Sequence, residues 1–266
     1  MNAVACSAPS ASSSLTVQGR VIAALILREI HTLYGNTSLG YLWAVILTAF
    51  NISVFWLFRE MFGAHAPHGM GMAVFLLCGF IPWYIFNDTV SRCMSAVRAN
   101  QALLTFPQVT ELDLMFGRLI VVWGTQTVCA AIILALAAAL GQPMELRRPG
   151  ALAATLFFAP LLGLGMGLIF ASLARFWPTL ERLVPIMMRF LFFASGVFFQ
   201  VSELPARLSE PLLFNPVAQL IEWQRYGFSA SSAAPAYSVS YAAVWCLGSL
   251  TLGLLLERCA RGRELR

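Results

Sequence analysis

The chain has 266 residues, of which 59% are hydrophobic and only 11% are charged. A soluble domain is about 25% charged and could not bury this much apolar surface in one core, so a water-soluble enzyme is excluded. The net charge is +5, and all seventeen Lys and Arg positions are arginine. This bias is compatible with an anionic cargo or anionic lipid headgroups. No basic cluster stands apart from the apolar segments, so no nucleic acid is expected as a partner.

The amino-terminal region divides into a tail and a lead-in segment. Residues 1–16 are mostly small and carry no charge, which predicts a disordered cytoplasmic tail ahead of a membrane domain at 17–266. Residues 17–34 mix aliphatic and charged side chains along one helical repeat. This pattern predicts an amphipathic helix that lies at the membrane interface. A short structural lead-in is the alternative.

Six segments are candidates for membrane spans. A spanning helix needs about 20 predominantly apolar residues. The fifth candidate is the least regular, because Pro185 and Arg189 lie within it. The segments are, in order, Leu39–Phe58, Met72–Val90, Leu114–Leu140, Ala151–Ala174, Leu183–Val201 and Ala236–Leu256.

Two further segments are too short or too polar to span. The polar character of residues 98–113 predicts a short surface helix between the second and third spans. Residues 211–221 are apolar but are interrupted by Pro216, which predicts short re-entrant helices between the fifth and sixth spans.

More arginines fall on the cytoplasmic side when both termini are cytoplasmic. The expected fold class is therefore an all-α membrane protein with six transmembrane helices.

The motifs that carry chemistry are few. No Walker A loop is present, so the chain is not expected to hydrolyse ATP itself. His65 and His68 offer a His-x-x-His pair, but the same loop holds no Cys and no carboxylate other than Glu60, and neither a catalytic nor a metal site is expected. Gly163 and Gly167 form a small-xxx-small step that predicts close helix packing. A flexible point in the helix is the alternative.

An arginine and several aromatic residues are candidates for a transport pathway. An arginine inside a span, such as Arg189, indicates function unless it reaches the membrane interface. Aromatic faces stack on sugar rings, so rings in the first and fifth spans would suit a carbohydrate chain, with core packing as the alternative. The candidate pathway aromatics are Trp43, Phe50, Trp56, Phe190, Phe193 and Phe199. The candidates for anionic contacts near a cytoplasmic entry are Arg28, Arg92, Arg98 and Arg189.

Several motifs together resemble one family. LILREIHTLYGNTSLGYLWA (25–44) resembles the opening of the permease subunits of ABC type-2 polysaccharide exporters. The likeness continues through FLLCGFIPWYIFND (75–88), ANQALL (99–104), FWPTLERLVPIMMRFLFFASGVFF (176–199) and FNPVAQLIEWQR (214–225). It is most similar to the KpsM-like capsule exporter permeases, and it covers nearly all of the chain after the tail.

The resemblance implies a homodimer in the bacterial inner membrane, paired with two copies of a separate ATPase that binds ATP and Mg. It implies a lipid-linked anionic polysaccharide as cargo, membrane lipids around the dimer, and a periplasmic adaptor or co-polymerase that leads to an outer-membrane channel. No cofactor is expected in this chain. The residues expected to contact the ATPase are Arg28, Glu29, Arg98, Asn100 and Gln101. The residues expected in the re-entrant helices are Asn215, Pro216, Glu222 and Arg225.

Other functions remain open at this point. Within transport, the same fold would serve O-antigen, a teichoic-type polymer or a small molecule. A second class is a membrane-embedded lipid-linked glycan transferase, which would need clustered acids, and Asp88, Glu111 and Asp113 form the nearest group. A third class is a scaffolding membrane protein, which Arg189 and the broken helix do not favour.

Overall fold

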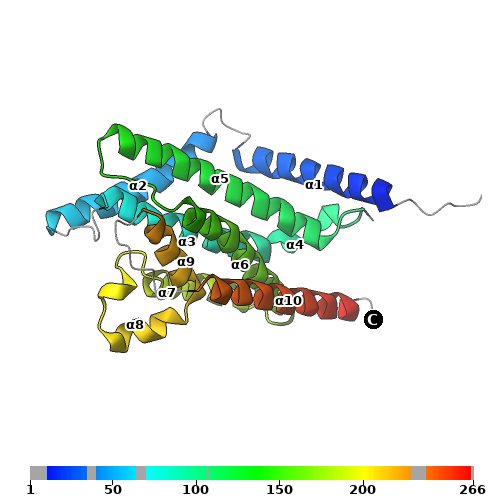
Figure 1. The fold of residues 1–266 in the computed structure, drawn as a ribbon. Coiled ribbons are helices and arrows are strands. Elements are labelled where there is room, and N and C mark those ends of the chain that lie inside the picture. Colours follow the sequence, from blue (N-terminus) through cyan, green and yellow to red (C-terminus); the bar gives the residue numbers. More distant parts are fainter. Residues whose placement is uncertain (1–10, 35–39, 64–69, 107, 229–237, 265–266) are drawn as a thin grey trace, which may run out of the picture.

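The chain folds as a bundle of helices, and the part of it that the structure describes contains no strand. The computed structural model describes residues 11–34, 40–63, 70–106, 108–228 and 238–264. Figure 1 shows the helices running largely along one common direction. The elements are α1 (Ala11–Tyr34), α2 (Gly40–Met61), α3 (Met72–Met94), α4 (Ala96–Ala99), η2 (Gln101–Leu103), α5 (Glu111–Ala139), α6 (Pro149–Phe176), α7 (Leu180–Ala194), η3 (Val201–Glu203), α8 (Ala206–Leu213), α9 (Pro216–Phe228) and α10 (Val239–Glu264).

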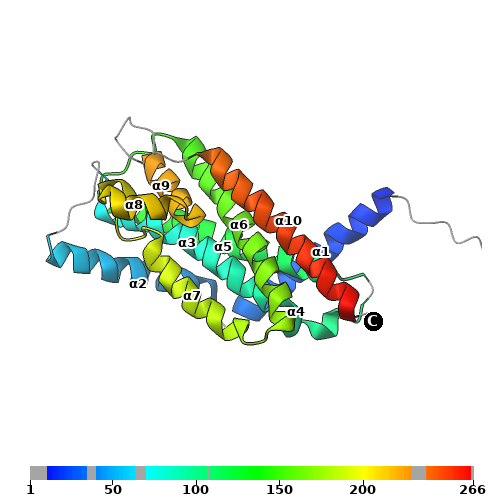
Figure 2. The same ribbon diagram turned by 90° about the horizontal axis from the view of Figure 1, so that it is seen from below.

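Helix α3 forms the centre of the bundle. It packs against α2, α5, α6 and α9, and residues on all its sides are buried. Helix α6 lies between α3 and α10, which covers its other side. The end of α10 and the short α4 lie at one end of the bundle, whereas α8 and α9 lie at the opposite end (Figures 1 and 2). The bundle therefore has two distinct ends.

Glycines allow α3, α6 and α10 to approach closely. A Cβ atom added at Gly163 would lie 2.8 Å from Thr89 Cβ, and one added at Gly167 would lie 2.6 Å from Cys93 Cβ. On the α10 side, a Cβ atom at Gly253 would lie 2.7 Å from Leu168 Cβ. Small residues at such positions let helix backbones approach in lipid. The structure thus confirms that Gly163 and Gly167 serve close packing.

Four of the described helices are long and apolar enough to cross a membrane: α3, α5, α6 and α10. They match the expected second, third, fourth and sixth spans to within four residues at each end, except that α10 continues eight residues beyond Leu256. Helix α2 begins and ends close to the limits expected of the first span, but it is not among the four. Helix α7 has 15 residues, or about 22 Å, which is shorter than the roughly 30 Å hydrocarbon layer. Length and composition therefore give four candidate spans among the described residues.

The expected fifth span, 183–201, is wrong at its carboxyl end, because α7 stops at Ala194. Gly196 takes a left-handed conformation with φ of 70°, and the chain turns away. The turn is held by Arg225 of α9, whose guanidinium donates to the carbonyl oxygens of Gly196 at 2.7 Å and Val197 at 2.6 Å. This guanidinium also donates to the Phe199 carbonyl at 2.7 Å. A residue distant in sequence thus ends the helix.

The Arg225 guanidinium is nearly inaccessible, with 1% of the side chain exposed, and is paired with Glu222 at 3.0 Å. It also lies over the Phe75 ring, 3.9 Å from the ring centroid, which ties α9 to α3. Gly79 makes room for the Val197 carbonyl to which Arg225 donates, because a Cβ atom at Gly79 would lie 2.6 Å from that carbonyl oxygen. The predicted pair of short helices is present as α8 and α9, and both extend beyond the expected limits of 211–221.

The other segments differ from expectation only locally. Helix α1 begins at Ala11, so it includes the last residues of the expected tail, 1–16. The expected surface helix at 98–113 is divided into α4 and η2. Helix α5 then begins at Glu111 with a capping box, in which Thr110 Oγ1 accepts from the Asp113 amide and the Asp113 carboxylate accepts from the Thr110 amide.

We predict that Arg225→Met destabilises the fold by about 3–5 kcal/mol, because it leaves the Glu222 carboxylate buried without its cation. The measurement is equilibrium unfolding of the detergent-solubilised chain in denaturant. Arg207→Met is the control, since Arg207 is an exposed arginine of α8. Equal stability of the two variants would contradict the role assigned to Arg225.

Candidate functional site

A groove of about 540 Å³ lies between α2, α3 and α7. We call it the α2–α7 groove. Helix α3 forms its floor, and α7 forms one wall. Its lining residues are Asn51 of α2, Phe80, Trp83, Tyr84, Asn87 and Ser91 of α3, and Pro185, Met188, Arg189, Phe192 and Phe193 of α7.

Helical periodicity brings these side chains together. Phe80, Tyr84, Asn87 and Ser91 follow one another at intervals of three or four residues, which places them along one face of α3. On α7, the same intervals of three or four residues lead from Pro185 to Met188 or Arg189, and from these to Phe192. The groove therefore changes from aromatic at Phe80 to polar at Asn87 and Ser91 as it follows α3 toward α4.

Aromatic rings build the end of the groove that lies away from α4. The Phe192 ring lies 5.3 Å from Trp83, 5.8 Å from Phe80 and 5.1 Å from Phe198, measured between ring centroids. The Phe55 ring of α2 lies 5.5 Å from Phe80 and 4.6 Å from Phe198. Tilted and edge-on aromatic pairs of this kind are each favourable by about 0.5–1.5 kcal/mol. They fix one end of α7 against α3 and α2.

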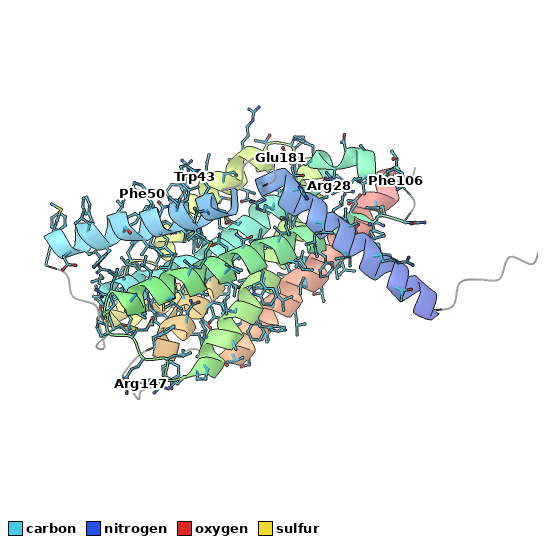
Figure 3. All side chains as sticks on the ribbon, turned by 90° about the horizontal axis from the view of Figure 1, so that it is seen from above. Arg28, Trp43, Phe50, Phe106, Arg147 and Glu181 are labelled. Atoms are coloured by element: carbon cyan, nitrogen blue, oxygen red, sulfur yellow. The ribbon has the colours of Figure 1, made fainter. Side chains whose placement is uncertain are left out.

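The structure places two of the predicted pathway residues, Arg189 and Phe193, in the groove. Phe190 is 73% exposed on the outside of α7, and Trp43 and Phe50 are exposed along α2, as Figure 3 shows. Neither these three residues nor the remaining three predicted ones line the groove. Trp56 packs partly buried against the core, Phe199 is half-buried near the Arg225 turn, and Arg92 lies in a different cavity.

A network of charges joins α1 to α3, α4 and α5. The Arg28 guanidinium of α1 donates to Asn100 Oδ1 at 2.5 Å. The Glu29 carboxylate lies 3.3 Å from Arg118 Nε of α5 and 3.7 Å from Arg92 Nη1 of α3. Charged groups at this depth are costly unless paired. The pairs therefore hold α1 against the bundle.

The residues expected to contact an ATPase lie at the end of the bundle that holds α4. Figure 3 shows Arg28 and Phe106 at this end, together with Glu181, and Arg147 at the other. The Arg98 side chain is 65% exposed and forms an ion pair with Glu181, and Gln101 is exposed as well. Asn100 is only 5% exposed. Its side chain also donates to the Ala96 carbonyl at 2.8 Å. Arg98 and Gln101 are therefore accessible at this surface, whereas Asn100 is buried.

Sequence reasoning missed several polar residues of these sites. Arg118 and Glu181 stand near the ends of apolar segments, where a single charge does not reveal its partner. Asn51 stands singly inside an apolar segment and gave no signal, whereas the helical spacing of Tyr84 and Asn87 on α3 was an available one. Arg118 and Glu181 find their charged partners, Glu29 and Arg98, on helices distant in sequence.

The candidate acids of a transferase do not come together. Asp113 belongs to the capping box of α5 and accepts from Gln18 at 2.6 Å. Glu111 forms an ion pair with Arg175, and Asp88 lies farther along α3 between α2 and α5. Among the described residues, no three His, Cys, Asp or Glu side chains are grouped to hold a metal ion. His65 and His68 lie outside the described residues.

Comparison with known proteins gives a family match over most of the chain. Residues 20–229 match the ABC-2 type transporter family. The polysialic acid transport protein KpsM of Escherichia coli is 28% identical over 249 residues, which cover 93% of this chain and 96% of that protein. The capsule polysaccharide export inner-membrane protein BexB of Haemophilus influenzae is 26% identical, over 92% of each chain. A more distant match is the O-antigen export system permease protein RfbA of Klebsiella pneumoniae, 22% identical over 73% of this chain and 74% of that protein.

We predict that Glu29→Gln loosens α1. Removing the carboxylate charge leaves Arg92 and Arg118 without their shared partner, and a hydrogen bond to a charged group is worth about 1.5–3 kcal/mol. Amide hydrogen exchange within α1 should become roughly tenfold faster or more. Glu60→Gln is the control, because Glu60 is an exposed carboxylate near the carboxyl end of α2. Unchanged exchange in α1 would show that the pair does not hold the helix.

Proposed function

Because the chain belongs to the ABC-2 type transporter family, we propose that it is the membrane subunit of an ATP-driven exporter that moves lipid-linked capsular polysaccharide across the bacterial inner membrane. The observation that carries this proposal is the similarity to KpsM and BexB over more than nine-tenths of the chain. Energy comes from a separate ATPase subunit, which binds ATP and Mg. This chain supplies the passage.

In the proposed topology, α2 and α7 complete six spans with α3, α5, α6 and α10. Both termini lie in the cytoplasm, and α8 and α9 lie as re-entrant helices at the periplasmic end. The separation of α4 and the end of α10 from α8 and α9 supports this arrangement. Because α7 is short, the Arg225 turn would lie within the outer part of the bilayer, where protein covers its backbone.

The proposed pathway follows the α2–α7 groove. Its aromatic rings offer faces for sugar rings, and Asn87, Ser91 and Arg189 offer partners for hydroxyl and anionic groups. The groove is open on one side in a single protomer, and α2 and α7 both carry exposed aromatic side chains beside it. A second copy of this chain would close the passage, so the functional unit is a homodimer.

The ATPase, in two copies, would dock on the exposed surface of α4 and η2. Movement of this surface would reach α1 through the bond between Arg28 and Asn100, and α3 through Glu29 and Arg92. On the opposite face, a periplasmic adaptor or co-polymerase and an outer-membrane channel would carry the polymer onward. Membrane lipids would cover the exposed apolar faces of α5 and α10.

A second candidate function is export of O-antigen, which the similarity to RfbA supports at lower identity and coverage. The same fold would also accept a teichoic-type polymer or a small molecule. A lipid-linked glycan transferase finds no support in the arrangement of Asp88, Glu111 and Asp113, because two of the three are engaged in structural contacts.

We predict that deleting the gene for this chain in its host abolishes surface capsule and causes polysaccharide to accumulate inside the cell. The measurement is an acid-sugar assay on washed cells and on lysates, with the O-antigen assayed in parallel. Restoration of capsule by the plasmid-borne gene is the control. Loss of O-antigen with normal capsule would favour the second function. Failure of the purified chain to bring down an ATPase subunit would overturn both.

We predict that Phe193→Ala and Arg189→Gln each lower export several-fold while the protein level stays unchanged. Loss of one stacking ring costs about 0.5–1.5 kcal/mol, and loss of the cation removes a partner for an anionic polymer. Phe157→Ala is the matched control, because Phe157 is an exposed aromatic residue of α6 outside the groove. Equal export by all three variants would contradict the assigned pathway.

A further inference from the structure

A second cavity lies between α2, α3 and α5, and its volume is about 260 Å³. We call it the α2–α3–α5 cavity. Asn51 and Tyr84 line both this cavity and the α2–α7 groove, so the two spaces meet at these side chains. The cavity lies beside the proposed pathway, toward the Arg92 end of α3.

The walls of the cavity are unusually polar for the interior of apolar helices. Thr48 and Asn51 come from α2, Tyr84 and Asp88 from α3, and Thr125 and Gln126 from α5. Polar and ionisable residues within membrane helices are costly, and they mark pathways and ligand sites. Helix packing alone does not account for the cavity, because protein interiors contain few voids larger than a water molecule.

Hydrogen bonds prearrange part of the cavity. The Asp88 carboxylate accepts from Gln126 Nε2 at 3.2 Å and from Asn87 Nδ2 at 3.1 Å. The Gln126 side chain is 9% exposed, and among the described residues its Oε1 atom has no hydrogen-bond partner. A buried acceptor without a donor costs about 1–3 kcal/mol. Because this atom is buried, the amide must turn toward the cavity before a ligand that donates a hydrogen bond can recover this free energy.

Arg92 adds a positive charge one helical turn from Asp88. Its side chain is about one-third exposed and lies 3.7 Å from Glu29, so it keeps a carboxylate partner outside the cavity. The lining therefore presents an acceptor pair at Asp88 and Gln126, hydroxyl groups at Thr48 and Thr125, and a cation at the rim. This set suits a ligand that both donates and accepts hydrogen bonds at several positions.

A sugar unit has this chemistry. Its hydroxyl groups donate to carboxylate and amide oxygens and accept from hydroxyl and guanidinium groups, and its ring packs on an aromatic face such as Tyr84. The volume is slightly below the 300–1,000 Å³ typical of pockets for small molecules. It therefore suits one sugar unit better than a length of polymer.

We propose that the α2–α3–α5 cavity is a second sugar-binding pocket, which holds one unit of the glycan while the chain lies in the adjoining groove. This inference rests on the proposed function. A glycan unit held in the pocket would anchor the polymer to each protomer between steps of movement. The residues that carry binding are Asp88, Thr125 and Gln126.

The test uses the complete complex of this chain with its ATPase subunit, reconstituted in lipid nanodiscs. The probe is capsule oligosaccharide released by mild acid hydrolysis from the same strain, and the readout is its dissociation constant. Gln126→Met and Thr125→Val remove polar atoms with little change of shape. Thr127→Val is the matched control, since the Thr127 hydroxyl donates to the Trp123 carbonyl of its own helix.

We expect Gln126→Met and Thr125→Val each to weaken oligosaccharide binding by about tenfold, whereas Thr127→Val should leave both this binding and the basal ATPase rate unchanged. Wild-type affinity in both cavity variants would overturn the inference, because the space would then hold only water or an ion. Complexes that purify intact and restore capsule, yet bind oligosaccharide equally in all variants, would refute the pocket and leave the exporter standing. A wild-type chain that restores no capsule would instead refute the proposed function itself.

Discussion

The burial of α3 on all sides is the constraint on which the rest of the bundle depends. Because α3 packs against α2, α5, α6 and α9, most of its polar side chains have to find partners within the protein. One face of α3 packs closely against α6, whose glycines lie opposite it. Another face carries Tyr84, Asn87 and Asp88, and the groove and the cavity between the helices lie beside these side chains.

Much of the fold could be predicted because its signal is local. Four of the six expected spans became the long apolar helices α3, α5, α6 and α10, and Met72 was expected to open its helix and does so. The end of α7 could not be predicted in the same way. Its position depends on the Arg225 guanidinium, which reaches three carbonyl groups almost thirty residues earlier in the chain. No local pattern around Ala194 contains that contact.

The candidate site was predictable only in part for a related reason. Arg189 was conspicuous as a charge within an apolar segment, and it does line the groove. Single polar residues such as Asn51 and Gln126 carry no such signal, since one amide in an apolar helix can equally bond to its own backbone. Asn51 does so, donating to the Leu47 carbonyl at 3.0 Å. Only the packing of α2, α3 and α5 reveals that these amides share a cavity.

The glycine contacts of α6 have a consequence for motion. With backbones this close on both sides, α3, α6 and α10 cannot slide past one another without collisions between Cβ atoms and main chain. These three helices therefore form a frame whose members move together. Any rearrangement that widens or narrows the groove has to be a rigid-body displacement of α2 or α7 against that frame. The two walls of the groove are thus also its movable parts.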